Sequence, residues 1–330
     1  MLDDRKAAIL SAVVQEYIAT VQPVGSTRVA KESGIDVSPA TVRNEMAALE
    51  EQGYLVQPHT SAGRIPTDKG YRFFVDSIRG GQRPIQPSDP RSVDDFFAGA
   101  HGQLEAMMLR TSTLLTEMTS WAGVVVGPTV EQATVRRVDI VDLSSHLAMV
   151  VAVLSNGVIE KRTVEVAVEL TPSIVEDASQ RLAGKVEGRT LAELATASSA
   201  HEPDPLLDAA LAALSEAGRT AELYVGGASR LAGAFAAVEQ VQEVLAVLEE
   251  QIVVVSMIRD LLDRGMRVAI GEETGVQPLA ECSIVVAPFS IGGQSAGTIG
   301  VLGPTRMDYS QALSAVALIS NRLERELNED

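Results

Sequence analysis

Residues 53–75 read GYLVQPHTSAGRIPTDKGYRFFV, and this stretch decides how the first part of the chain is understood. Tyr54–Val56 and Arg64-Ile65 have the composition of two short strands, and the proline and glycine between them suit a turn. Thr67 stands where it can cap a helix, and the residues after it place apolar side chains at helical spacing. The stretch therefore predicts a small hairpin, or wing, followed by a helix.

Three helices are predicted upstream of this hairpin. Apolar residues recur every four positions from Ile9 to Tyr17, which indicates a helix over residues 4–20. Ser26 can cap a short second helix over residues 27–33, because its side-chain oxygen can accept a hydrogen bond from a backbone N–H of the first turn.

A third helix is predicted to open at Ser38, with Pro39 at its first position, and to close at Gly53. Its apolar positions share one face: Val42, Met46 and Leu49. Polar residues near its N-terminal end lie outside that face: Ser38, Thr41, Arg43 and Asn44. Three short helices with these turns, followed by a hairpin, predict a winged helix-turn-helix over residues 1–80.

The length of 330 residues suggests two or three domains, and charge is divided unequally among them. The chain has 27 basic and 44 acidic residues, a net charge of −17. Residues 1–83 contain ten of each sign, so the whole excess of negative charge lies downstream. Because an evenly acidic protein would be repelled by DNA, any nucleic-acid role is confined to the first module. The residues rich in Gly and Pro at 81–90 are assigned to a linker.

Beyond the linker, residues 91–165 and 235–330 are predicted to form one α+β domain, interrupted by an insert over 166–234. Three strand-like runs precede the insert: residues 135–143, 147–154 and 158–168. Asn156-Gly157 is a strong signal for a tight turn, so these runs are expected to form an antiparallel meander. Helical patterns fill most of the insert, and strands return before a terminal helix over about residues 309–326.

The motifs of the first module resemble those of HrcA, the bacterial family of heat-inducible transcription repressors of chaperone operons. Three segments carry the resemblance: Gly53-Tyr54-Leu55, residues 58–67 (PHTSAGRIPT) and residues 70–75 (GYRFFV). The resemblance implies that the α+β domain is GAF-like and that the insert is a dimerisation domain. It further implies a homodimer that binds an inverted-repeat operator of the CIRCE type as a negative regulator, is released on heat stress, and depends on the GroE chaperonin.

The leading turns of a helix in the major groove reach the edges of the bases. Arg43 can bind guanine through two hydrogen bonds, Asn44 can pair with adenine, and Thr41 can contact a thymine methyl group. Hydroxyl and cationic side chains near the helix starts suit phosphate oxygens: Ser26, Thr27, Arg28 and Ser38. Three wing residues can reach the adjoining backbone or minor groove: His59, Thr60 and Arg64. Ser38 is also expected to cap its helix.

Two other classes of function are weighed against the repressor. The GAF-like domain could bind a small effector and shift the geometry of the dimer, which would make the protein a ligand-gated regulator. An enzyme with a DNA-binding appendage would need a cleft with perturbed ionisable groups. The sequence has no phosphate-binding loop and no GxSxG nucleophile motif, so we predict that the protein is not an enzyme.

The sequence also predicts no metal site and no cofactor. The four histidines lack the spacing of metal ligands, and a single cysteine, Cys282, cannot form a disulfide within the chain. The longest apolar runs, such as Leu147–Leu154, are too short to span a membrane. The first ten residues show no signal peptide. We therefore expect a cytoplasmic protein without membrane association.

Overall fold

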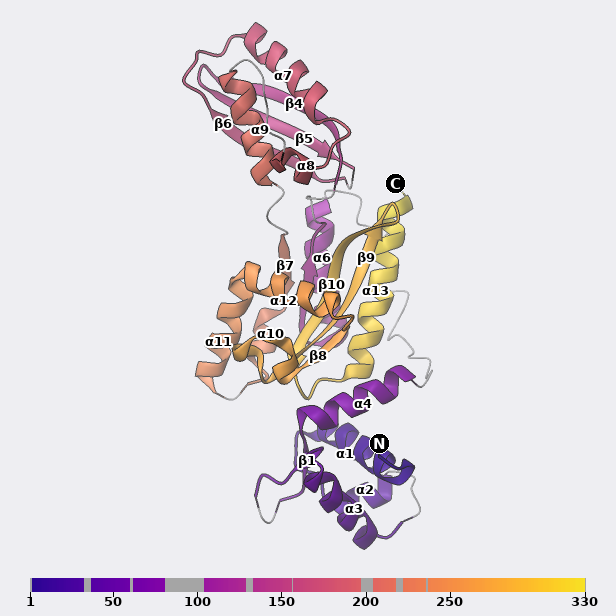
Figure 1. Cartoon of the computed structure of the whole chain (residues 1–330). Helices are drawn as coiled ribbons and strands as arrows, with labels where there is room; N and C mark the ends of the chain where they lie inside the picture. The colour runs from indigo at the N-terminus through magenta and orange to yellow at the C-terminus, as the bar shows by residue number, and fades with distance from the viewer. Residues whose placement is uncertain are drawn as a thin grey trace.

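A computed structural model describes residues 2–32, 37–59, 62–80, 104–128, 133–155, 157–196, 204–217, 222–235 and 237–329. Thr60 and the predicted linker, residues 81–90, lie outside the described residues. Three parts follow one another along the long axis of the molecule: a helical N-terminal unit, a central body and a second α+β unit at the opposite end (Figure 1). The mixed α+β class is confirmed.

The N-terminal unit contains the helices and the hairpin that the sequence predicts. Its elements are α1 (Asp4–Thr20), α2 (Ser26–Glu32), α3 (Pro39–Glu51), β1 (Leu55–Val56), β2 (Ile65–Pro66) and α4 (Asp68–Gly80). The two strands pair antiparallel, with Leu55 opposite Pro66. The apolar faces of α1 and α3 meet in the core, since Ile9, Val13, Val42 and Met46 are all buried.

Local interactions explain where these helices begin and end. The Ser38 hydroxyl accepts a hydrogen bond from the backbone N–H of Thr41 at 3.2 Å, which confirms it as the cap of α3. Gly53 follows α3 with φ of +75°, a conformation that glycine adopts without strain. The Thr67 hydroxyl accepts from the N–H of Gly70 at 3.2 Å at the start of α4. The capping signals at Ser38 and Thr67 are therefore confirmed, whereas α2 already includes Ser26, which the sequence places at the cap before that helix.

The central body is built on an antiparallel sheet with the strand order β7-β3-β10-β9-β8. The strands are β3 (Ala122–Val126), β7 (Leu223–Gly226), β8 (Val268–Ile270), β9 (Cys282–Ile291) and β10 (Gln294–Pro304). Short 3₁₀ turns, η1 (Gly271–Thr274) and η2 (Gln277–Leu279), follow β8. Since successive side chains of a strand point to opposite faces, the sheet contributes to a separate apolar core on each side.

Helices cover both faces of this sheet (Figure 1). One face packs against α6 (Leu104–Thr119) and α13 (Tyr309–Glu329). The other face packs against α10 (Ala228–Ala232), α11 (Val238–Glu249) and α12 (Gln251–Asp263). None of the helices within the described ranges combines the length and the apolar character that a membrane-spanning segment needs.

The second α+β unit has its own sheet and its own core. Its strands, in the order β4-β5-β6, are β4 (Val135–Ser144), β5 (Leu147–Leu154) and β6 (Ile159–Glu165). Its helices are α7 (Pro172–Val186), α8 (Leu191–Thr196) and α9 (Pro205–Ala217). The antiparallel meander is confirmed, since β5 pairs with both of its neighbours in antiparallel register.

The extent of this unit differs from the predicted insert of residues 166–234. The three strands that the sequence assigns to the interrupted domain pack instead against α7 and α9, so the unit spans about residues 133–217. The physical reason is that one face of β5, from Ala148 to Leu154, is buried by those helices. At the other boundary, β7 lies within the predicted insert but pairs with β3 of the central sheet.

Cys282 lies at the start of β9, buried in the core of the central body. Burial raises the pKa of its thiol to about 12, because the thiolate would lose its hydration. Since the thiolate is the nucleophile, we expect iodoacetamide at pH 8 to leave the native protein unmodified and to alkylate Cys282 fully in denaturant. Mass spectrometry measures both, and alkylation of the native protein at the rate of a free thiol would contradict this prediction.

Candidate nucleic-acid interface

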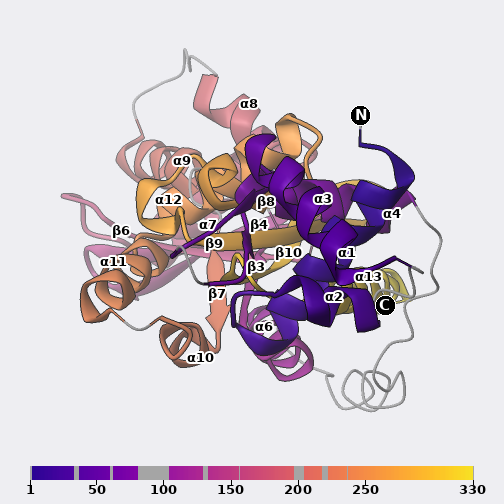
Figure 2. The same ribbon diagram turned by 90° about the horizontal axis from the view of Figure 1, so that it is seen from below.

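Helix α3 lies at the end of the molecule farthest from the second α+β unit (Figure 1). Viewed from that end, α1, α2, α3 and α4 lie in front of the central sheet (Figure 2). One face of α3 is buried in the core, while the N-terminal half of its other face exposes Arg43 and Asn44. Thr41 is half-buried, and its hydroxyl lies 3.0 Å from the hydroxyl of Ser38. The predicted base-reading residues therefore share one accessible region.

The predicted phosphate-binding residues of α2 lie at its first turn. Ser26 is half-buried, whereas Thr27 and Arg28 are exposed. The Arg28 guanidinium forms an ion pair with Glu16 of α1 at 2.6 Å. Arg28 thus retains an exposed surface while its position is set by a partner on the neighbouring helix.

Arg64 is held inside the unit more firmly than the sequence indicates. Its backbone N–H and carbonyl both pair with Val24, each at 2.9 Å, and its Nε donates to a Glu50 carboxylate oxygen at 2.9 Å. Its side chain is only 14% exposed. At Gly63 a Cβ atom would collide with the carbonyl oxygen of Val24, so glycine is required for this close approach. Arg64 therefore joins the wing to α3 and to the segment before α2.

The other wing residues are less constrained by the structure. His59 is exposed at the tip of the hairpin, and Thr60 lies outside the described residues. The side-chain amide of Gln57 donates to the carbonyl of Ala62 at 2.8 Å and so bridges the two sides of the loop. The structure therefore places His59 on the wing but does not describe Thr60.

Carboxylates near the exposed face of α3 have cationic partners. Glu45 lies 3.8 Å from Arg5 and 3.5 Å from Lys6, and Glu50 pairs with Arg64. Because Glu45 and Glu50 each have a cation beside them, the electric field that these two carboxylates direct at a DNA backbone is reduced. The unit can thus approach phosphates although its own net charge is close to zero.

One set of contacts was not found by sequence reasoning: the docking of α4 onto the central body. Arg72 of α4 donates from Nε to Glu273 of η1 at 2.9 Å and from Nη2 to the Val268 carbonyl at 2.8 Å. Arg72 and Glu273 are 201 residues apart in the chain, so no local pattern could pair them. The only available signal was a charged residue within an otherwise apolar motif.

The part of the chain that the structure describes also bears on other kinds of site. No group of three or more His, Cys, Asp or Glu side chains there is placed to hold a metal ion. A hollow beside α12 is lined by Val255, Arg259 and Thr298 among others, and it is open to solvent. Nothing in its lining identifies an effector, so the ligand-gated alternative stays a prediction.

An exposed third helix, preceded by two short helices and followed by a wing, defines a class of protein, the winged helix-turn-helix transcription regulators. A family profile described as "HrcA protein C terminal domain" matches residues 105–313. The chain is 37% identical over 335 residues to "Heat-inducible transcription repressor HrcA" of Symbiobacterium thermophilum, covering 98% of both chains. The chain belongs to the HrcA family of heat-inducible transcription repressors. The function predicted from the motifs is confirmed at this level.

Two further likenesses agree with this assignment. A protein of the same name from a Nocardioides species is 36% identical over 338 residues, and the match covers 100% of both chains. A solved structure, titled only as that of a hypothetical protein, has a TM-score of 0.69 at 25% sequence identity, covering 100% of this chain and 99% of the other. The two sequence relatives are named as transcription repressors, and the description of the solved structure gives no function.

Proposed function

We propose that two copies of this chain bind an inverted-repeat operator of the CIRCE type ahead of chaperone operons and block their transcription. The observation that carries the proposal is the exposed N-terminal half of α3, with Arg43 and Asn44 on its solvent face at one end of the molecule. The acidic remainder of the chain lies on the other side of this unit, where salt screens its repulsion beyond about 8–10 Å. A repressor of this kind acts in the cytoplasm, where the bacterial DNA lies.

The proposed contacts divide into base reading and backbone binding. Arg43, Asn44 and Thr41 enter the major groove, where Arg43 has the two-pronged geometry that guanine accepts. Backbone phosphates are proposed to meet the polar residues at the helix starts: Ser26, Thr27, Arg28 and Ser38. Wing contacts are proposed for His59, Thr60 and Arg64. The ion pair between Arg64 and Glu50 supports a bracing role for Arg64 in addition to any contact with DNA.

The homodimer is proposed to form through the second α+β unit, which serves as the inserted dimerisation domain beside a GAF-like body. Helices α7, α8 and α9 cover one face of its sheet, and the opposite face, called here the outer face, carries a row of apolar side chains along β5. Val141 and Ile159 on this face are 46% and 52% exposed. The half-buried β5 residues between them are Leu147, Met149, Val151 and Val153.

The register of the strands places two further apolar residues beside this row. Val141 lies opposite Met149, and Val153 lies opposite Ile159. Charges of both signs border the apolar residues: Arg137, Asp139, Lys161 and Glu165. Exposed apolar surface with a polar rim is typical of a protein interface. A second copy can cover it through a twofold axis, which also matches the symmetry of an inverted repeat.

Release on heat stress and dependence on the GroE chaperonin are proposed from family membership. Proteins are normally stable by only a few kcal/mol, so a regulator that relies on folding can lose its active fraction over a narrow range of temperature. If the operator affinity of the purified protein is unchanged both by heating and by chaperonin, this part of the proposal is wrong.

Footprinting of the full chain on DNA upstream of chaperone operons tests the proposed function directly. We expect protection of two half-sites related by a twofold axis, and protection that weakens as salt rises because phosphate binding releases counterions. Absence of protection at all such promoters, with the protein shown to be dimeric, would contradict the proposal.

Arg43→Ala is expected to weaken binding to this operator by about 1–3 kcal/mol, the contribution of a bidentate contact with a base. Binding to random DNA should change much less, since only one exposed cation is lost. Competition titrations with operator and random duplexes measure both, with Arg259→Ala on α12 as a control for the loss of an exposed arginine. An equal loss on both kinds of DNA would show that Arg43 binds phosphate instead of reading a base.

A further inference from the structure

The guanidinium of Arg72 connects the winged-helix unit to two elements of the central body at once. In addition to the Nε bond to Glu273, its Nη2 contacts the second oxygen of the same carboxylate, so the pair is bidentate. The same Nη2 donates to the backbone carbonyl of Val268 in β8. One side chain thus binds both β8 and η1.

The acceptor is itself held in place, which distinguishes this pair from a mobile surface ion pair. The Glu273 carboxylate also accepts a hydrogen bond from the backbone N–H of Ile270 at 2.9 Å. The side chains of Arg72 and Glu273 are only 22% and 32% exposed. The planar guanidinium of Arg72 loses little conformational freedom when it binds a carboxylate that is already oriented. The pair therefore favours one orientation of α4.

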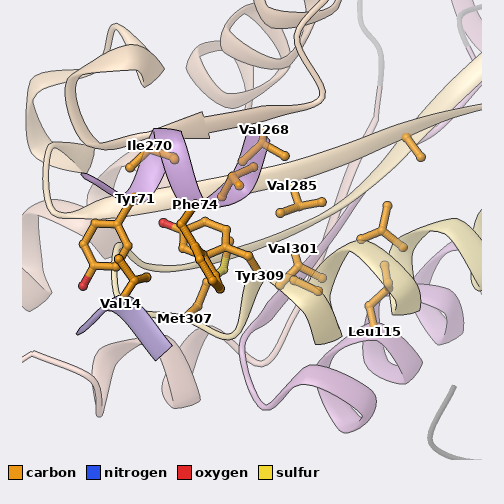
Figure 3. Packing of buried hydrophobic residues seen from close by; sticks show 14 of the residues in the cluster. Val14, Tyr71, Phe74, Leu115, Val268, Ile270, Val285, Val301, Met307 and Tyr309 are labelled. Carbon is orange, nitrogen blue, oxygen red and sulfur yellow. The ribbon is translucent and has the colours of Figure 1, made fainter. Parts of the chain in front are cut away.

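The backbone around this pair is shaped for close contact. Gly271 has φ of +55°, and a Cβ atom on it would collide with the Asp68 carboxylate of α4. Burial in the contact raises the pKa of the Asp68 carboxyl group. Next to this polar contact, Tyr71 packs beside Tyr309, with ring centroids 5.9 Å apart (Figure 3). Polar and apolar contacts together hold α4 against the body.

Connectivity alone would not set this orientation. The covalent path from Gly80 to Leu104 includes 23 intervening residues, about 75 Å of chain at full extension. Without docking, the second winged-helix unit of a dimer (the described residues up to Gly80, called the headpiece from here on) would be distributed over many positions, whereas a docked headpiece is concentrated at one half-site spacing. Docking through α4 therefore affects which spacing of half-sites a dimer can bind.

We infer that Arg72 is a positioning residue: by holding α4 against β8 and η1, it fixes the winged-helix unit on the body so that the two α3 helices of a dimer match one spacing of half-sites. This inference rests on the proposed operator-binding dimer. It requires no contact between Arg72 and DNA. Glu273 is the partner through which Arg72 acts.

The test compares three duplexes: one with a single half-site, one with the inverted repeat found by footprinting, and one whose spacer is changed by about five base pairs, half a helical turn. The wild-type protein is expected to prefer the original spacing strongly. Arg72→Ala and Glu273→Gln should lower affinity for the original repeat by about tenfold and flatten the preference for spacing. Affinity for the single half-site should stay within about twofold of wild type, because α3 is unchanged.

Three further variants make the result specific. Arg72→Lys keeps the positive charge but loses the planar guanidinium group. Its affinity for the original repeat is therefore expected to lie between those of wild type and Arg72→Ala. Arg72→Ala combined with Glu273→Gln should lose no more than Arg72→Ala alone, since that single substitution already removes both the pair with Glu273 and the bond to Val268. Arg259→Ala, an exposed arginine on α12 outside the contact, should behave as wild type.

Three results would overturn the inference, and each is separable from failure of the proposed function. A spacing profile of Arg72→Ala that equals wild type would show that the contact sets no geometry. A parallel loss on half-site and repeat would show that Arg72 only stabilises the fold of the headpiece. A wild-type protein that binds half-sites specifically but ignores spacing would also reject the inference, while operator recognition itself would stand.

Discussion

A glutamate in place of Met149 is expected to convert the protein to a monomer and to lower its affinity for an inverted-repeat operator at least about a hundredfold. Met149 lies at the middle of β5 on the outer face, between Val141 and Thr163 of the flanking strands. In the proposed dimer the substitution would bury a carboxylate from each copy in an apolar contact, at a cost that exceeds what the interface can offset. Each headpiece would then bind its half-site alone.

Light scattering across a range of protein concentrations measures whether the Met149→Glu protein is a monomer or a dimer. Titration of repeat and half-site duplexes measures its affinity for DNA. Affinity for the half-site should remain near wild type, because the headpiece is far from the substitution (Figure 1). Ile174→Glu is the matched control, since Ile174 is an exposed apolar residue on α7 of the same unit but in its helical layer. A Met149→Glu protein that stays dimeric would exclude the outer face as the interface.

The headpiece could be predicted from the sequence because its signals are local. Ser38, Pro39 and Gly53 mark both ends of α3 within sixteen positions, and an amphipathic pattern between them decides which face is buried. The same pattern left Arg43 and Asn44 outside the core, where the structure places them. Short-range rules of capping and periodicity are sufficient for such elements, so helix bounds and exposed residues were both obtained.

Long-range pairings could not be predicted, because they depend on which elements share a core. The residues of β5 are apolar on both faces, so the pattern could not tell whether its strand joined the central sheet or a separate one. Arg64 was recognised as a cation in the wing, but its partner Glu50 lies at the end of the preceding helix. For Arg72 the partner lies in η1, beyond the whole inserted unit.

Replacing Tyr71 by alanine is expected to lower the free energy of unfolding by about 3–5 kcal/mol, the usual loss for a buried aromatic ring. Tyr71 is only 3% exposed and packs against the buried ring of Tyr309. Figure 3 shows Tyr71 and Phe74 of α4 beside Met307 and Tyr309 of the body, within one apolar cluster that also includes Val14. Since headpiece and body share this core, the loss should destabilise both.

Urea unfolding at one fixed protein concentration tests this coupling with two probes. Fluorescence of Trp121, the one tryptophan of the chain, reports on the body, and far-ultraviolet circular dichroism reports on all helices. Both transitions of Tyr71→Ala should move together to lower urea, as expected for one cooperative unit. Tyr71→Phe keeps the ring and should stay within about 1 kcal/mol of wild type. If the Trp121 transition stays at its wild-type midpoint while the helical signal shifts, the headpiece unfolds independently, and the shared core does not couple the two parts.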